Sequence, residues 1–457
     1  MTRNAFAMPP LFRSLAARLA PVFLVFVLLS ATAPAQAQLA IIRDAEIEAM
    51  VADFAAPLLR AAGMPRTPRI VIVNERRFNA FVTEEGDIYV NYGTVLESPT
   101  PAALKAVLAH EIGHLAGGHV ARLREQMDIR ARVQAITMFM GIGAIAAASG
   151  SGSSDVSHMA TAMIMASQSA SMNSLMAYRQ GEESAADAAA LRILQAAGQT
   201  PRGLVDTLTI LLQNQVQRAG ASGYLSSHPL AQDRLQQVEA AARQSPYWSR
   251  GDSRADIQAL DMAKAKLAGF LEGTATVANR YPNSDGSLAA RYARVIAAYK
   301  AGGGISALQI MPSLISSAPS NPYLRELHGQ MLYELGRPGE ALAPLRRAVD
   351  LAPDATLIRI LYGQALVGAG GAANLNEAVL QLKRSAVAEP RNVRIHLLLS
   401  QAYGGLGMAG HASLSAAEAA LWRGDEPTAR GLARQAQGQL PQGTPEWLRA
   451  GDILAMN

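Results

Sequence analysis

The chain has 457 residues, which is too long for one ordinary hydrophobic core, so two or three domains are expected. It contains no cysteine, which excludes thiolate metal ligands, a cysteine nucleophile and disulfides, so any metal must be held by His, Asp or Glu. The net charge of +5 comes from scattered basic residues, and aromatic residues make up only 5% of the chain. Nucleic-acid binding therefore has little support, whereas peripheral contact with an anionic membrane surface stays open.

Residues 1–37 have the pattern of a secretory signal peptide. Basic residues up to Arg18 precede an apolar run from Pro21 to Ser30, and Ala35-Gln-Ala37 supplies a small-x-small cleavage motif. The apolar run is too short for a comfortable membrane span, so an uncleaved anchor is the less favoured alternative. We expect cleavage after Ala37 and export of the rest of the chain.

Residues 38–250 mix helical and strand patterns, which predicts an α+β domain. Apolar residues at helical spacing predict a helix over 45–62. A second helix should follow a Pro-rich turn and run from about Ala102 to Leu115. Alternating apolar residues predict three short strands between the two helices, over residues 69–73, 78–82 and 87–92.

Residues 133–177 differ from the rest of this domain. Two apolar segments rich in Ala, Met and Ser flank a Gly/Ser-rich centre at residues 149–154. Gly/Ser sequences are flexible and Met-rich surfaces adapt to varied partners, so one interpretation is a mobile lid over a cleft. The alternatives are a pair of buried helices joined by a loop and, less favoured because of the Ser, Gly and Gln content, a hairpin inserted in lipid.

Residues 257–457 are repetitive. Pairs of Ala and Pro recur with a separation of 12 residues, at Ala307/Pro319, Ala341/Pro353, Ala378/Pro390 and Ala429/Pro441. The first two pairs are 34 residues apart, the period of tetratricopeptide repeats, and the later spacings of 37 and 51 imply insertions at 370–373 and around 404–411. Each repeat is a helical hairpin that buries its apolar face on a neighbour, which predicts an all-α solenoid. An ordinary helical bundle is the alternative.

The segment from His110 to His114 carries the chemistry. Residues four apart share a helix face, so His110 and His114 can each offer a ring nitrogen to one metal ion. Glu111 lies beside them, where it can accept the proton of an attacking water and later deliver it to the leaving amine. The three residues form the H-E-x-x-H zincin motif, and the alternative is two surface histidines on an ordinary helix.

A catalytic zinc ion needs a third protein ligand and one open position. The H-E-x-x-H-x-x-G-x-x-H pattern would place a third histidine at position 120, which is Val120, so we interpret His119 as a structural or ligand-supporting residue. Glu183, in a strongly helical segment, is the better candidate and would complete a His-His-Glu site of gluzincin type. Asp187 shares its helix face and could hydrogen-bond a ligand histidine, whereas Glu182 fits a solvated acidic helix start.

H-E-x-x-H followed by a distant E-x-x-x-D on a second helix resembles the Ste24-type family of zinc metallopeptidases. The similarity is greater to its periplasmic members with a C-terminal tetratricopeptide domain, the β-barrel assembly-enhancing protease group. Three further features agree with that group: His119 itself, the segment from His119 to Arg122, and Ser227-His228-Pro229 with Arg234 six residues later. The resemblance covers nearly the whole chain after the signal peptide.

The resemblance implies a gluzincin-type metalloprotease domain with one zinc ion per chain, followed by the repeat solenoid. It implies a periplasmic endopeptidase, located free or peripheral to the outer membrane, that cleaves misfolded or stalled outer-membrane proteins. Contact with the outer-membrane assembly machinery is implied as well. His228 would be able to occupy the open zinc position and keep the enzyme latent, and Arg234 would pair with acidic groups near the site.

Two expectations concern the substrate. An unfolded polypeptide should lie extended beside an edge strand near Asp87 to Asn91 and pair main chain to main chain, which tolerates many sequences. A function of a different class also stays open, namely a chaperone or assembly scaffold whose repeat groove does the main work with little proteolysis.

Overall fold

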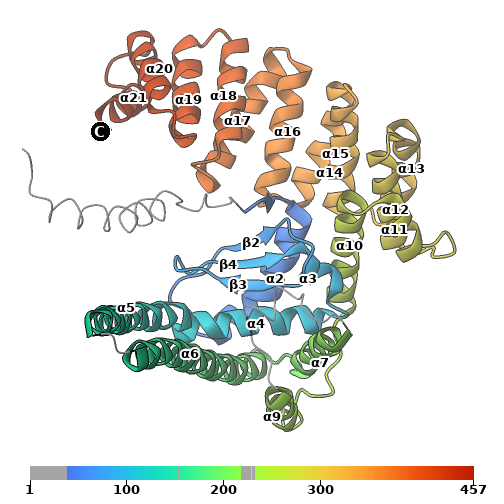
Figure 1. Ribbon diagram of the computed structural model, residues 1–457. Coiled ribbons are helices and arrows are strands. Elements are labelled where there is room, and N and C mark those ends of the chain that lie inside the picture. Colours follow the sequence, from blue (N-terminus) through green and yellow to red (C-terminus); the bar gives the residue numbers. More distant parts are fainter. Residues whose placement is uncertain (1–38, 152–153, 218–227, 229–231, 457) are drawn as a thin grey trace, which may run out of the picture. The chain divides into compact units, whose positions relative to one another are not determined.

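The structure is a computed structural model that describes residues 39–151, 154–217, 228 and 232–456 (Figure 1). The predicted signal peptide and its cleavage position lie outside the described residues. Ile41–Asn457 form one compact unit. Among the helices of the described ranges, none combines the length and the apolar character that crossing a membrane requires.

A small mixed sheet forms the β part of the N-terminal domain, with the strand order β1 (Ile41–Ile42), β2 (Ile70–Val73), β4 (Ile88–Asn91), β3 (Ala80–Val82). β2, β3 and β4 lie within the three predicted strands, whereas the two-residue β1 was not predicted. β4 pairs in parallel with β2 and antiparallel with β3, so both of its edges are occupied. The expectation of an edge strand near Asp87 to Asn91 is therefore wrong. The β3–β4 hairpin places β3 at the outside of the sheet.

Two helices surround this sheet where the sequence predicts them. Asp44 caps α2 (Ala45–Ala61), and Thr100 caps α4 (Pro101–Gly117), which ends at Gly118 in the left-handed conformation with a φ of 65°. Between the sheet and α4 lies the short α3 (Tyr92–Glu97). Every residue of α4 from Pro101 to His114 is buried, and the helix packs against β3, α2 and α6. The alternative of surface histidines on an ordinary helix is therefore wrong.

The segment after α4 forms two long helices, α5 (His119–Ser151) and α6 (Ser154–Ala196), which lie side by side in Figure 1. Both halves of the segment are helical, as the alternative of two buried helices expected. That alternative is wrong about burial, because the apolar side chains that the structure describes there are exposed. Val133, Ile136 and Phe139 are 56%, 59% and 80% exposed. Movement of this hairpin as a lid stays a prediction.

The rest of the described chain is mainly helical. In the N-terminal region the described residues include the helices α7 (Arg202–Gln217) and α9 (Gln232–Ala242). The repeat region consists of α10 (Arg254–Leu271), α11 (Thr274–Arg280), α12 (Leu288–Lys300), α13 (Gly304–Ser317), α14 (Pro322–Glu334), α15 (Pro338–Leu351), α16 (Thr356–Ala369), α17 (Ala372–Ala388), α18 (Val393–Gly405), α19 (Ala409–Trp422), α20 (Glu426–Gln439) and α21 (Pro445–Ala455). From α14 to α21 each helix packs mainly on its neighbours in sequence, which is the packing of a solenoid rather than of a bundle.

Small residues set the spacing of the repeats. A Cβ on Gly329 would lie 2.3 Å from Leu345, and one on Gly363 would lie 2.8 Å from Leu382, so equivalent glycines admit a leucine from the next helix. The spacing of 51 residues is not an insertion around 404–411, because that stretch is an ordinary connection between α18 and α19. The interval is long because its two alanines lie in α17 and α20, with a further helical pair between them.

A buried ionic cluster joins the repeat region to the N-terminal domain. Lys266 of α10 places its Nζ 2.8 Å from Asp44 Oδ2, 3.6 Å from Glu46 Oε2 and 3.5 Å from Glu326 Oε2. These carboxyl groups belong to the start of α2 and to α14. A continuous hydrophobic core also runs from α2 through α10 into the repeats, so the two regions share packing.

Candidate metal centre

The centre is built where α4 and α6 approach each other closely. A Cβ on Gly113 would lie 2.9 Å from the carbonyl oxygen of Ala186, so only glycine at this position allows the two helices to pack at this distance. His110 and His114 lie on the face of α4 that meets α6. Glu183 lies about one turn before Ala186 and therefore reaches the same point.

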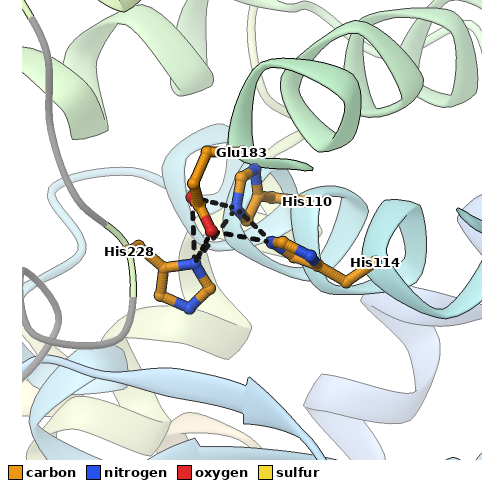
Figure 2. Close-up of side chains that lie close together, drawn as sticks. All are labelled: His110, His114, Glu183 and His228. Atoms are coloured by element: carbon orange, nitrogen blue, oxygen red, sulfur yellow. Dashed lines mark hydrogen bonds and ion pairs between the residues drawn. The ribbon is translucent and has the colours of Figure 1, made fainter. Parts of the chain in front are cut away.

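The side chains of these residues converge, as Figure 2 shows. The Nε2 atoms of His110 and His114 are 3.0 Å apart. Glu183 places Oε2 at 3.3 Å from the first of these nitrogens and Oε1 at 3.4 Å from the second. Tetrahedral zinc with bonds of about 2.0–2.1 Å separates its ligand atoms by roughly 3.3 Å, so this donor set fits the ion.

A fourth donor comes from His228, between α7 and α9. Its Nδ1 lies 3.0 and 3.1 Å from the two carboxylate oxygens of Glu183 and 3.4 Å from His110 Nε2. On the other side of the ring, Nε2 lies 3.1 Å from the carbonyl oxygen of Ala80 in β3, to which it can donate. If the ring hydrogen sits on Nε2, Nδ1 carries none and faces the Glu183 carboxylate as a second acceptor. Two acceptors at this distance need a proton or a cation between them.

Glu111 is fully buried beside the donor cluster. Among the residues that the structure describes, neither of its carboxylate oxygens has a hydrogen-bond partner. Its Oε1 lies 3.6 Å from His228 Nε2. A buried carboxylate without hydrogen-bond donors is costly for folding, so its place beside three metal-type ligands indicates a chemical role rather than a structural one.

Asp187 and Arg234 hold the cluster from behind. Asp187 Oδ1 lies 3.0 Å from His110 Nδ1, on the side of the ring opposite the donor atom. Arg234 donates to both Asp187 oxygens, at 2.8 and 3.0 Å, and its Nη1 lies 3.1 Å from Glu183 Oε2. The guanidinium of Arg234 therefore fixes the carboxylates of Glu183 and Asp187, which lie one helical turn apart on α6.

Charge in this cluster keeps the carboxylates ionised. Burial alone would raise the pKa of Glu183, but hydrogen bonds from His110, His114 and His228 outweigh it and hold the pKa well below its usual range. Burial is likewise outweighed at Asp187, whose pKa is lowered by His110 and Arg234. Both groups are therefore available as anions to support a metal ion.

His110 and His114, the two predicted ligands of α4, differ in protonation. Burial would lower the pKa of His110, but Asp187 and Glu183 outweigh it and raise the pKa to about 10. Burial lowers the pKa of His114, which is therefore neutral near pH 7. Because a metal ion binds only unprotonated imidazole, binding should release a proton from His110.

His119 is not among the converging donors and lies behind His114. Its Nδ1 is 2.8 Å from His114 Nδ1, and its Nε2 is 3.2 Å from Glu182 Oε2. Glu182 also receives a hydrogen bond of 2.8 Å from Arg122 Nη2. The interpretation of Glu182 as a solvated acidic residue is therefore wrong, because it pairs with two residues of α5 that the sequence did not place near it.

A pocket of about 730 Å³ opens beside His114. Its walls are the end of β3, the β3–β4 turn and the first turns of α5, and its lining includes Val82, Glu84, Leu115 and Ile129. The pocket is therefore the continuation of the metal centre toward the exposed face of α5.

These features define a metalloprotease. An H-E-x-x-H helix, a glutamate from a second helix and a buried unpartnered glutamate beside them are the parts that hydrolysis of peptide bonds by a metal site requires. Residues 42–242 match the model of peptidase family M48. This part of the chain is therefore a domain similar to the peptidases of family M48.

Several similar proteins carry the name beta-barrel assembly-enhancing protease. The protein of Yersinia pestis is 25% identical over 401 residues, which cover 86% of this chain and 79% of that protein. The protein of Escherichia coli K12 is 24% identical over 302 residues, which cover 64% of this chain and 60% of the relative. The chain thus spans less than two thirds of the length of the second relative.

Solved structures resemble the chain only weakly. The MamA MSR-1 C2 structure has 18% identity, covers 36% of this chain and 92% of its own, and gives a TM-score of 0.32. A thermophilic TPR protein of Thermus thermophilus has 18% identity, covers 37% of this chain and all of its own, and gives a TM-score of 0.25. At these scores the resemblance says nothing about function.

Proposed function

We propose that the chain is a zinc-dependent endopeptidase of the periplasm that cleaves misfolded or stalled outer-membrane proteins. The observation that carries this proposal is the buried Glu111 beside three converging metal-type ligands, His110, His114 and Glu183. The names of the relatives, beta-barrel assembly-enhancing protease, support the substrate class. A zinc ion in this site would polarise the scissile carbonyl and make water a better nucleophile.

The residues of the chain then divide the remaining work. Glu111 accepts the proton of the attacking water and delivers it to the amine nitrogen as the carbon–nitrogen bond breaks. Asp187 contacts Nδ1 of His110 and thereby fixes the ring with Nε2 toward the metal. Arg234 holds Asp187 and Glu183 together, which keeps the ligand set in place between turnovers.

The substrate is proposed to lie along β3, the edge strand beside the site. Main-chain pairing with an edge strand accepts many sequences, which suits an enzyme for misfolded proteins. The adjoining pocket would receive side chains next to the scissile bond. Beyond it, α5 carries a stripe of exposed apolar residues at helical spacing, namely Ile129, Val133, Ile136 and Met140, which are 47%, 56%, 59% and 59% exposed. Apolar segments of an unfolded chain fit this surface.

His228 is proposed to keep the enzyme latent. Its Nδ1 lies among the metal-type donors, and its Nε2 lies within hydrogen-bonding distance of the carbonyl oxygen of Ala80 on β3. One side chain thus occupies both the open ligand position and part of the edge that a substrate would use. The repeat region is proposed to bind substrates or the outer-membrane assembly machinery, with contact to the membrane surface only peripheral.

The test is cleavage of an unfolded outer-membrane β-barrel protein by the chain from Gln38 onward. Zinc-loaded wild type, Glu111→Gln and His228→Ala are compared, because Glu111→Gln should keep zinc and lose the proton acceptor. We expect wild type or His228→Ala to cleave the protein. Glu111→Gln should reduce the rate of cleavage by at least about 100-fold. Equal cleavage by Glu111→Gln would contradict the mechanism. Silence of both wild type and His228→Ala with zinc bound would favour the scaffold function.

A further inference from the structure

We infer that His119 and Glu182 form a supporting pair that fixes the ring of the metal ligand His114, an inference that rests on the proposed zinc site. His114 turns its Nε2 toward the donor cluster. In a neutral ring the hydrogen must then sit on Nδ1, which lies 2.8 Å from Nδ1 of His119. His114 therefore donates and His119 accepts.

The second nitrogen of His119 completes the chain of contacts. Because Nδ1 of His119 accepts, its hydrogen sits on Nε2, which lies 3.2 Å from Glu182 Oε2. Arg122 Nη2 donates to the same carboxylate oxygen at 2.8 Å, and Nη1 of the same guanidinium donates to the carbonyl oxygen of Gly117. His119 is only 6% exposed, so water does not compete strongly for these contacts.

The backbone turn between α4 and α5 is shaped for this arrangement. Gly118 adopts a φ of 65°, which ends α4 and lets α5 begin at His119 with its ring folded back over the last turn of α4. A Cβ on Gly117 would lie 2.2 Å from His119 Nε2. Any side chain at position 117 would therefore push the ring away from His114.

The two ligand histidines are thus supported by carboxylates in different ways. Asp187 contacts His110 directly, whereas Glu182 acts on His114 through one intervening imidazole. Such support fixes the tautomer and raises the basicity of a ligand histidine, and its loss typically weakens metal affinity by about 10- to 100-fold. His119 is a positioning residue in this scheme, since it contacts the ligand and not the metal.

The test measures zinc affinity of the full chain by competition with a chelator. His119→Ala and Gly117→Ala should each weaken zinc binding by about 10- to 100-fold. His119→Asn should stay within about threefold of wild type, because its amide oxygen can accept from His114 Nδ1. His328→Ala, which removes a histidine of the repeats, is the matched control and should bind zinc as wild type does.

A second readout needs no metal. Nitrogen NMR of the ring of His114 in metal-depleted protein should show the Nδ1–H tautomer in wild type and His119→Asn and a mixture in His119→Ala. Unchanged zinc affinity in His119→Ala, or equal weakening in His119→Asn, would overturn the inference. Failure of both wild type and His228→Ala to cleave protein while they bind zinc would contradict the proposed function alone.

Discussion

Two of the buried charge clusters among the described residues each contain three carboxyl groups and one fixed cation. The metal centre contains Glu111, Glu183 and Asp187 with Arg234. The cluster between the N-terminal domain and the repeats contains Asp44, Glu46 and Glu326 with Lys266. Each cluster has an excess of negative charge, and the two differ in how that excess is balanced.

The pKa values show the difference. At the metal centre the pKa values of Glu183 and Asp187 are lowered, because imidazole rings and a guanidinium surround them in spite of burial. At the other cluster burial dominates and raises the pKa of Glu46 to about 7 and the pKa of Glu326 above its usual range. A cluster of carboxylates that stays ionised can take up a metal ion. The cluster around Lys266 takes up protons instead and has a structural role, joining the N-terminal domain to the repeats; we call it the structural joint.

The largest effect is expected at the structural joint. Replacement of Lys266 by methionine leaves three carboxyl groups with no cation and should lower the free energy of unfolding by about 3–5 kcal/mol near pH 8. Denaturant unfolding of the full chain measures it. Lys383→Met, at an exposed position of α17, is the control and should change the free energy by less than about 0.5 kcal/mol. A loss no larger than that of the control would show that the joint does not depend on charge balance.

A smaller effect is expected at the metal centre. Asp187→Asn removes the anion that contacts His110 and should weaken zinc binding by about 10- to 100-fold. Because Asp187 also pairs with the buried Arg234, the metal-free chain should lose some stability, but less than in the Lys266 variant. Chelator competition and unfolding of metal-depleted protein give the two quantities. If the variant lost stability and kept its zinc affinity, Asp187 would be structural and the contrast between the clusters would fail.

The smallest effect is a pH dependence at Glu46. Its folded-state pKa of about 7 exceeds the ordinary value of 4.5, so its contribution to stability is full below about pH 4.5 and is lost as pH rises through 7. Glu46→Gln cannot ionise and keeps an acceptor for Tyr292. Its free energy of unfolding relative to wild type should therefore rise by about 1–2 kcal/mol from pH 5 to pH 8. Parallel stability curves for the two proteins would contradict this assignment.

The centre of the site was predictable because its chemistry fixes local spacing. His110, Glu111 and His114 must lie within one helical turn of each other, so sequence alone brings them together. Glu183 is 69 residues further on, but a metal site needs a third ligand, and the helical E-x-x-x-D pattern offered one. The repeats were predictable for a related reason, because each hairpin packs on its neighbour and leaves a period in the chain.

Other features depend on contacts that leave no local pattern. β3 rather than β4 lies at the sheet edge because β4 also pairs in parallel with β2, which the alternation of apolar residues does not reveal. Glu182 is paired only because α5 and α6 lie side by side. The apolar composition of α5 favoured burial, but Ile136 and Phe139 are exposed. Among the described residues the fold brings no element over these side chains, and composition alone does not reveal that.

Zinc binding by His110, His114 and Glu183 underlies both the proposed hydrolysis and the proposed support by Asp187 and Glu182. The measurement is a titration of metal-depleted chain with zinc at about pH 7.5, for wild type and Glu183→Gln. We predict one zinc ion per chain for wild type, release of a proton on binding, and an affinity at least about 100-fold lower for Glu183→Gln. Failure of the wild type to bind zinc, or equal affinity in the two proteins, would contradict the assignment of this centre as a zinc site.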